Sequence, residues 1–178
     1  MKRSDPSVLP IRRFGDLVLR EPSREVETFD SLLAKLYEDM LETMYRAPGV
    51  GLAAPQVGLS LRLFVFDQAD GSGPGAVANP ILSEREGSES EDEGCLSIPG
   101  LYFPTERATS VRVDGRDIRG DPITLRGTGL LARILQHETD HVNGVLFIDR
   151  LAGDVRKRAL AAIRDRDLSA ESGPTRRA

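Results

Sequence analysis

The sequence predicts an α+β fold, in which mainly antiparallel β-sheets pack around one central helix and a further helix lies toward each end of the chain. The central helix is indicated by helical periodicity over residues 128–142, which contain both histidines of the protein. The sheets are indicated by short apolar or alternating runs separated by turn residues. Because no internal repeat or linker divides the 178 residues, we expect a single domain over residues 1–178.

Composition narrows the classes of function. The hydrophobic fraction of 39% and the charged fraction of 29% fit a soluble globular protein, and no apolar run is long enough to span a membrane. The net charge of −4 gives no electrostatic reason to bind DNA or a membrane surface. A single cysteine cannot form an internal disulfide, and no apolar core of a secretory signal follows the basic N-terminal residues. We therefore expect a cytoplasmic protein.

The N-terminal region is expected to form an arm followed by a helix. Residues 1–27 carry three prolines and little periodicity, which favours an extended arm with a mobile tip. Residues 29–45 have helical spacing, and Pro48 and Gly49 follow as a stop. We expect the apolar stripe of this helix to pack in the core rather than to bind a ligand; it consists of Leu33, Leu36, Met40 and Met44.

Most of the strands are expected in the middle of the chain. The apolar run 61–66 and the run 76–82 predict two strands, the first of them buried, joined by a Gly-rich turn. Residues 110–126 alternate on both sides of 119–122, which is typical of a hairpin. The acidic run 83–93 is expected to be mostly a solvated loop. Toward the C-terminus we expect a short strand at 145–148, a helix of mixed charge at 154–166 and a loose tail at 169–178.

The central helix contains an H-E-x-x-H motif. His137 and His141 lie one turn apart on the same face, so both imidazoles can reach a single metal ion. Glu138 projects to the side of the pair, where it can contact a metal-bound water without acting as a ligand. Thr128 is placed to begin the helix, and Asn143 with the following glycine is placed to end it.

The motif by itself leaves two interpretations open. H-E-x-x-H can arise by chance on an amphipathic helix, whereas a catalytic metal site needs a third protein ligand and an open position for water. Outside the motif the chain has no histidine and one cysteine, Cys95. A lone cysteine is most often a small buried apolar residue, but the glycine before Cys95 and the missing third ligand weaken that interpretation.

Residues 49–56 are too rich in Gly and Pro for a helix and too apolar for an ordinary surface loop. Small residues let a backbone approach another chain closely, and an extended stretch here could pair with a peptide as an added strand. Gln56, at the end of the segment, offers an amide donor. Taken alone, however, the segment is equally typical of a tight structural loop, and that is the interpretation we favour from the residues alone.

Three segments together resemble the signature motifs of the peptide deformylase family: GVGLAAPQ at 49–56, EGCLS at 93–97 and QHETDH at 136–141. They occur in the order and with the spacing typical of that family, and the resemblance runs from about residue 8 to residue 151. It implies hydrolytic removal of the formyl group from the N-terminal methionine of newly synthesised polypeptides, with release of formate.

The resemblance also implies a metal centre. Cys95, as a thiolate, would hold one divalent ion together with His137 and His141, and Glu138 would take a proton from water and return it to the leaving amine. A thiolate with two imidazoles suits iron, zinc, nickel or cobalt. The family favours Fe(II) in the cell, with Zn, Ni or Co able to substitute.

The resemblance assigns the oxyanion and the peptide to backbone and amide groups. The oxyanion of the tetrahedral intermediate would be met by the side chain of Gln56 and the backbone N–H of Leu96. Backbone groups of Val50, Gly51 and Gly94 match positions that pair with the substrate peptide.

The remaining assignments concern the methionine pocket and the support of the metal ligands. Leu130 and Ile134 share the helix face of His137, so they can line an apolar pocket for the methionine side chain. Arg133 lies on the same face where the family often has an aliphatic residue, and this departure concerns the edge of that pocket. Glu93 resembles a supporting carboxylate that pairs with an arginine, here Arg107.

The partners implied are N-formyl-methionyl nascent polypeptides and the ribosome near its exit tunnel; we expect a monomer that binds no membrane and no specific DNA. A basic strip on the C-terminal helix could contact ribosomal RNA, although four aspartates interleave with it. The strip consists of Arg150, Arg156, Lys157, Arg158, Arg164 and Arg166, and the aspartates are Asp149, Asp154, Asp165 and Asp167.

Two rival functions share the same motif. A metallopeptidase that cuts internal peptide bonds would use the same H-E-x-x-H chemistry, but Cys95 as a ligand and the small-residue segment 49–56 argue against it. An inactive metal- or ribosome-binding relative should have lost Glu138, Gln56 or a metal ligand, and this chain retains all of them.

Overall fold

The computed structural model describes residues 5–171, with side chains described through residue 166. It contains a five-stranded sheet in the order β1-β2-β3-β6-β7 and a two-stranded sheet, β4-β5, and every pair of neighbouring strands is antiparallel. The predicted α+β class is therefore confirmed. The strands are β1 Gly51–Ala53, β2 Leu63–Phe66, β3 Gly75–Glu86, β4 Glu89–Cys95, β5 Ile98–Arg107, β6 Ser110–Arg116 and β7 Pro122–Thr128.

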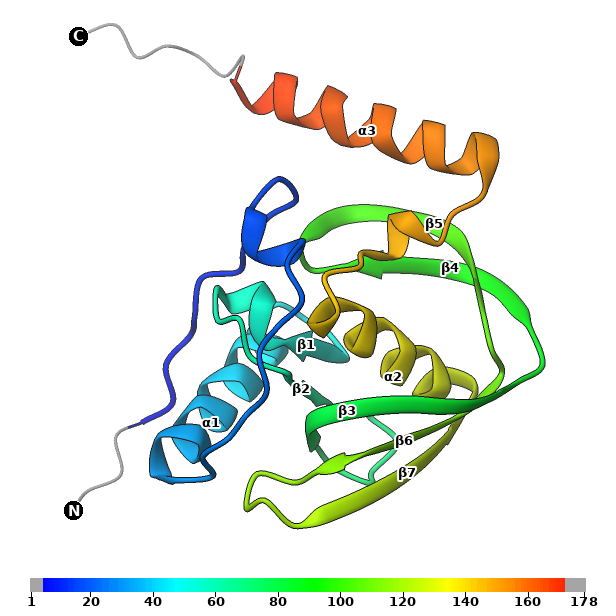
Figure 1. Ribbon diagram of the computed structural model, residues 1–178. Coiled ribbons are helices and arrows are strands. Elements are labelled where there is room, and N and C mark those ends of the chain that lie inside the picture. The colour runs from blue at the N-terminus through cyan, green and yellow to red at the C-terminus, as the bar shows by residue number, and fades with distance from the viewer. Residues whose placement is uncertain (1–4, 172–178) are drawn as a thin grey trace, which may run out of the picture.

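Three helices complete the fold: α1 Ser31–Arg46, α2 Gly129–Val142 and α3 Gly153–Glu171. The motif helix α2 lies between the two sheets, α1 packs on the β1-β2 side, and α3 crosses beside β5 (Figure 1). Every residue of α2 from Ala132 to Val142 is buried, polar residues included. Such a helix must supply partners for its own polar side chains, and this requirement shapes the site described below.

The ends of the helices follow from local chemistry. Asp30 begins α1, and its carboxylate accepts hydrogen bonds from two backbone N–H groups of the first turn. Thr128 takes the extended conformation of an N-cap residue at the start of α2, although its side chain makes no capping bond. Beyond Asn143, Gly144 adopts φ +74°, a left-handed conformation that favours glycine and ends the helix.

Two predictions for the chain are wrong. The acidic run 83–93, predicted as a loop, forms the end of β3 and most of β4. Arginines of the neighbouring strands explain the difference, since Arg112 pairs with Glu84 and Arg107 with Glu93. The segment 145–148, predicted as a strand, contains instead the start of a 3₁₀ turn at Phe147–Asp149. Three consecutive apolar side chains are buried there, which a half-buried strand does not allow.

Two further predictions concern the ends of the chain. Helix α3 continues to Glu171, so the predicted start of a tail at residue 169 is too early; residues 172–178 lie outside the described part. The expected mobile tip falls at residues 1–4, which are also outside it. Among the described residues, no helix combines the length and the apolar composition needed to cross a bilayer.

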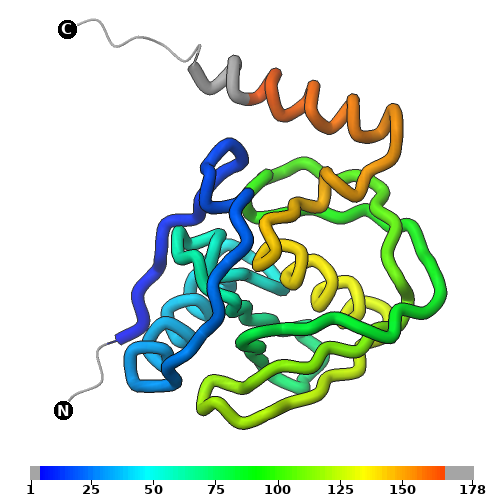
Figure 2. The backbone as a smooth tube through the Cα atoms, viewed as in Figure 1, coloured from blue at the N-terminus to red at the C-terminus, as the bar shows by residue number. Residues whose placement is uncertain are grey.

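The N-terminal arm passes the segment 54–57 and reaches the turn between β4 and β5 (Figure 2). The backbone N–H of Arg12 donates to the carbonyl of Gln56 at 2.7 Å, and that of Phe14 donates to the carbonyl of Ser97 at 2.9 Å. The arm therefore holds together two segments that are far apart in the sequence and that both belong to the predicted site.

Candidate active site

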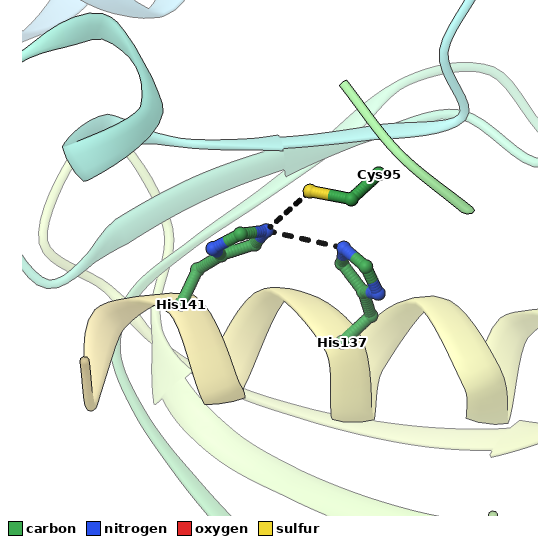
Figure 3. Close-up of side chains that lie close together, drawn as sticks. All are labelled: Cys95, His137 and His141. Atoms are coloured by element: carbon green, nitrogen blue, oxygen red, sulfur yellow. Dashed lines mark hydrogen bonds between the residues drawn. The ribbon is translucent and has the colours of Figure 1, made fainter. Parts of the chain in front are cut away.

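The structure brings Cys95, His137 and His141 together (Figure 3). Both histidines project from one face of α2, and Cys95 ends β4 above them. Nε2 of His141 lies 3.1 Å from Nε2 of His137 and 3.3 Å from Sγ of Cys95. All three potential ligand atoms lie within 4.8 Å of one another. The three residues predicted as metal ligands thus converge on one point.

This arrangement fits a divalent metal ion. Ligand atoms bound tetrahedrally at about 2.0–2.3 Å are roughly 3.3–3.7 Å apart. The distances from Nε2 of His141 to the other two ligand atoms, 3.1 and 3.3 Å, are close to this spacing. The Nδ1 atom of His137 donates to Glu93 at 2.6 Å, which leaves Nε2 with a lone pair for a metal. One cysteine sulfur and two imidazole nitrogens form a donor set that suits several first-row ions.

Glu138 lies beside the ligands and is fully enclosed. Its Oε2 atom is buried and has no hydrogen-bond partner among the described residues. Its Oε1 atom presses against Gly51, where an added Cβ would lie 2.3 Å from it. Burial raises the pKa of Glu138 to about 7, against the opposing charge of His137. A carboxyl group with this pKa can both accept and return a proton near neutral pH.

Gln56 is fixed at one end and directed at the ligands with the other. Its Oε1 accepts from the backbone N–H of Ala53 at 2.8 Å. Its Nε2 lies 3.3 Å from Oγ of Ser97 and 3.5 Å from Sγ of Cys95. The carbonyl end is thus fixed by the backbone, and the amide N–H₂, which donates to Ser97 and Cys95, is the end directed at the ligands. The side chain is almost completely buried, so its orientation is set by these contacts.

A cavity of about 390 Å³ opens onto these groups. Every residue predicted to bind substrate or to act in catalysis lines it, whereas His141 and Arg107 lie behind. Tyr102 and Pro99 of β5 also line it and were not predicted. Tyr102 faces Gly94 across the β4-β5 pair, where an added Cβ would lie 2.5 Å from its ring. In the sequence, Gly94 indicated that a side chain packs closely against the backbone at this point. That this side chain is Tyr102 depends on the strand register, which the sequence does not give. The predicted lining residues are Val50, Gly51, Gln56, Glu93, Gly94, Cys95, Leu96, Leu130, Arg133, Ile134, His137 and Glu138.

Glu93 reaches the cavity wall, and its carboxylate is held by several cationic or ring N–H groups. Arg107 donates to both of its oxygens, at 2.6 and 3.0 Å, and Nη1 of Arg133 donates at 3.0 Å. Burial alone would raise the pKa of Glu93, but hydrogen bonds from His137 and Arg107 hold it well below its ordinary value. Glu93 therefore stays ionised and fixes the ring of His137.

Asp140 continues this network and was not predicted. It accepts from Nη1 of Arg107 at 2.6 Å and from Arg150 at 2.6 and 3.1 Å. The available signal was an acidic residue directly before His141 in a helix that must be buried. Its partners come from β5 and from the chain after α2, so local spacing could not indicate them.

A cysteine sulfur and two imidazoles on one point, next to a buried carboxyl group and an apolar cavity, define a metal-dependent hydrolase of the H-E-x-x-H class. Comparison with known proteins gives the family. The family profile described as polypeptide deformylase matches residues 8–157. A peptide deformylase of Acidothermus cellulolyticus is 51% identical over 166 residues, which cover 93% of this chain and 91% of the relative.

Solved structures agree. A peptide deformylase from Legionella pneumophila superposes with a TM-score of 0.86 at 42% identity, covering 94% of this chain and all of that one. A peptide deformylase from Synechococcus elongatus, solved with actinonin, has a TM-score of 0.82 at 40% identity, covering 91% and 93%. The chain belongs to the polypeptide deformylase family. It is a hydrolase that removes the N-formyl group from newly synthesised polypeptides.

Proposed function

We propose that the residues of this site divide the hydrolysis of the formyl amide as follows. Cys95, His137 and His141 hold one divalent ion, Fe(II) in the cell, with Zn, Ni or Co able to replace it. When bound, such an ion supplies Lewis-acid chemistry, polarising the carbonyl and lowering the pKa of water toward about 7. Glu93 and Arg107 keep the ring of His137 in the orientation that binding requires.

Glu138 is the general base and then the general acid. It accepts a proton from the attacking water as the oxygen bonds to the formyl carbon, and it gives that proton to the amine nitrogen as the C–N bond breaks. The products are formate and a free N-terminal methionine. Oε2 of this buried carboxyl group accepts no hydrogen bond from the described residues, which supports this role because the oxygen is left to receive the proton.

Gln56 and Leu96 stabilise the negative charge on the formyl oxygen in the transition state. The amide of Gln56 already points at the metal ligands and is held there by Ala53. Leu96 follows Cys95 directly and lines the cavity, so its backbone N–H lies in the same region. A donor preorganised in this way is commonly worth about 3 kcal/mol.

The substrate peptide binds as an added strand between two sheets. β1 is an edge strand of the larger sheet, and β4 has a partner on one side only. Val50 and Gly51 of the first edge and Gly94 of the second line the same cavity. Free backbone groups on two facing edges are what an extended peptide pairs with. The methionine side chain enters the part of the cavity lined by Leu130, Arg133 and Ile134.

The partner is the formylated nascent chain, with the ribosome near its exit tunnel as a second one, and we place the protein in the cytoplasm as a monomer. Only part of the expected basic strip supports ribosome binding. Arg150 is bound to Asp140, Arg166 donates to the carbonyls of Pro99 and Gly100, and Lys157 lies near Asp154. Arg158 and Arg164 of α3 are exposed and are the cations that we assign to rRNA phosphates.

The observation that carries this proposal is the convergence of Cys95, His137 and His141 beside Glu138 on the floor of a peptide-sized cavity. The test is an assay of anaerobically purified protein whose metal content is measured. Formyl-Met peptides should be deformylated, whereas N-acetylated peptides and internal peptide bonds should be cut far more slowly. Cleavage of internal bonds at a comparable rate would favour the metallopeptidase instead.

A further inference from the structure

Arg133 belongs both to the wall of the cavity and to the charged network behind the metal ligands. It lies on α2 one turn before His137 and lines the cavity, yet only 8% of its surface is exposed. A buried guanidinium in the wall of an apolar pocket is costly unless its charge is paired. An aliphatic side chain would serve the pocket alone, so the charge of Arg133 needs a separate explanation.

The contacts of its guanidinium supply that explanation. Nη1 donates to Oε2 of Glu93 and to the backbone carbonyl of Thr105, both at 3.0 Å. Nη2 lies 3.6 Å from a carboxylate oxygen of Glu89 and is itself buried. The charged head is therefore held by acceptors on strands β4 and β5.

This orientation leaves the stem of Arg133 for the cavity wall. Nη2 is buried and Nη1 is held by two acceptors, so we assign the methylene groups to the cavity wall. Arginine commonly uses its stem as an apolar surface while its head reaches polar groups elsewhere. Leu130, three residues before Arg133 on α2, and Ile134, directly after it, line the same cavity, so the stem adds apolar surface to the wall that they form.

The second arginine on Glu93 provides a contrast. Arg107 makes two hydrogen bonds to the same carboxylate, but it does not line the cavity. Glu93 in turn accepts from Nδ1 of His137 at 2.6 Å. Of the two arginines that fix Glu93, Arg133 alone therefore also contacts the space that the substrate side chain fills.

We propose that Arg133 is a positioning residue that links the methionine pocket to the metal site. Its stem forms the pocket wall against which the substrate side chain packs. Its guanidinium fixes Glu93, and through Glu93 the ring of His137. This inference rests on the proposed function for the identity of the pocket. It follows that one residue sets both the preference for the N-terminal side chain and the retention of the metal.

The test separates these two contributions with three variants of the nickel-loaded protein. Arg133→Met keeps a straight stem and removes the guanidinium, Arg133→Ala removes both, and Arg107→Met removes only a partner of Glu93. The first measurement is the rate at which nickel passes to a chelator. The second is the ratio of kcat/KM for formyl-Met and formyl-Ala peptides that are otherwise identical.

Loss of a group that orients a metal ligand typically costs 10–100-fold in affinity, and Arg133 acts one step further away. We expect Arg133→Met to release nickel about tenfold faster and to keep its preference for methionine within about twofold. Arg133→Ala should release nickel equally fast and lose about tenfold of that preference, because its pocket wall is gone. Arg107→Met should release nickel faster still without changing the preference.

Nickel release from Arg133→Met at the wild-type rate would overturn the link to the metal. An unchanged preference in Arg133→Ala would overturn the role in the pocket. If Arg133→Met does not fold, Arg133→Lys decides, because it keeps the charge but loses the fork and should release nickel several times faster than the wild type. The release measurement needs no substrate, so failure of the wild type to deformylate would overturn the proposed function without altering this result.

Discussion

The two sides of the metal-ligand group differ in how their polar groups are paired. On the side of the cavity, Glu138 has a buried oxygen without a partner among the described residues, and Gln56 directs its amide toward Cys95. On the opposite side, Asp140 and Glu93, which also reaches the cavity, each accept several hydrogen bonds from arginines. Two buried carboxylates on neighbouring elements thus have opposite properties: the pKa of Glu138 is raised, and that of Glu93 is lowered.

The difference indicates which polar groups can react and which ones hold the metal ligands in position. Groups with incomplete pairing can take on a proton or a developing charge during the reaction. Groups with complete pairing cannot, but they hold a ligand ring in one orientation. Changes on the cavity side should therefore reduce turnover with metal bound, and changes behind should weaken metal binding. The predictions below test that division.

The largest effect is expected for Cys95→Ser, at the boundary of the two sides. A serine hydroxyl is not ionised at neutral pH and is a poor ligand for these ions, so retention of the metal should fall sharply and activity with it. Metal content after gel filtration and the far-UV circular dichroism spectrum distinguish metal loss from unfolding. Full metal occupancy together with full activity would contradict a three-ligand site.

Glu138→Gln should have the next largest effect and should act on turnover alone. Glutamine cannot accept a proton, so kcat should fall by roughly 10²–10⁴ or more while metal content and fold are kept. Metal analysis and a melting curve serve as controls. A variant that deformylates formyl-Met peptides at the wild-type rate with metal bound would show that another group moves the proton.

The same residue predicts the direction of the pH dependence. Because burial raises the pKa of Glu138 to about 7, the carboxylate form that accepts a proton is lost as the pH falls through that value. The kcat/KM of the wild type should fall on this acidic limb, with an apparent pKa that belongs to Glu138 and the attacking water together. The Glu138→Gln variant should lack the limb.

Gln56→Leu removes the oxyanion donor from the cavity side without removing a metal ligand. We expect kcat to fall by roughly 10²–10³ with metal still bound. The effect should appear in kcat rather than in KM, because the donor is matched to charge that develops only in the transition state. An unchanged kcat would return the segment 49–56 to a purely structural role.

Gly51→Ala tests how closely the peptide-binding edge approaches Glu138. The added Cβ would lie 2.3 Å from Oε1 and 2.8 Å from the carboxyl carbon, so the carboxylate must move. A displacement of a catalytic group by about 1 Å can lower the rate by about 10². Gly71→Ala is the comparison for backbone effects away from the site, since its Cβ would meet nothing within 4 Å, although a φ of +90° disfavours alanine there. Equal activity of the two variants would mean that Glu138 tolerates displacement.

The cavity side was more accessible from the sequence than the side behind it. The ligands His137 and His141 follow from a spacing within one helix. Gly51 and Gln56 were assigned by the family resemblance of one short segment, whose composition alone favoured a structural loop. Arg133, Asp140 and Tyr102 owe their roles to partners on β4, β5 and the chain after α2, which are set by strand register and packing. The acidic run 83–93 was mistaken for a loop for the same reason, because the arginines that pair with it come from other strands.

The smallest effect is expected for Asp140→Asn, the outermost link of the side behind the ligands. Asparagine keeps one acceptor oxygen but loses the charge that faces Arg107 and Arg150. Arg107 would keep its two bonds to Glu93, so we expect metal affinity to fall by about tenfold or less, at the low end for groups that support a ligand. The kcat of the metal-loaded variant should stay within about twofold of the wild-type value, because Asp140 does not line the cavity.

Asp114→Asn is the matched control: Asp114 also pairs with an arginine, Arg112, but on the surface of β6. A fall in kcat at full metal occupancy for Asp140→Asn, absent from the control, would mean that the side behind the ligands takes part in the reaction itself, and the division between the two sides would have to be abandoned.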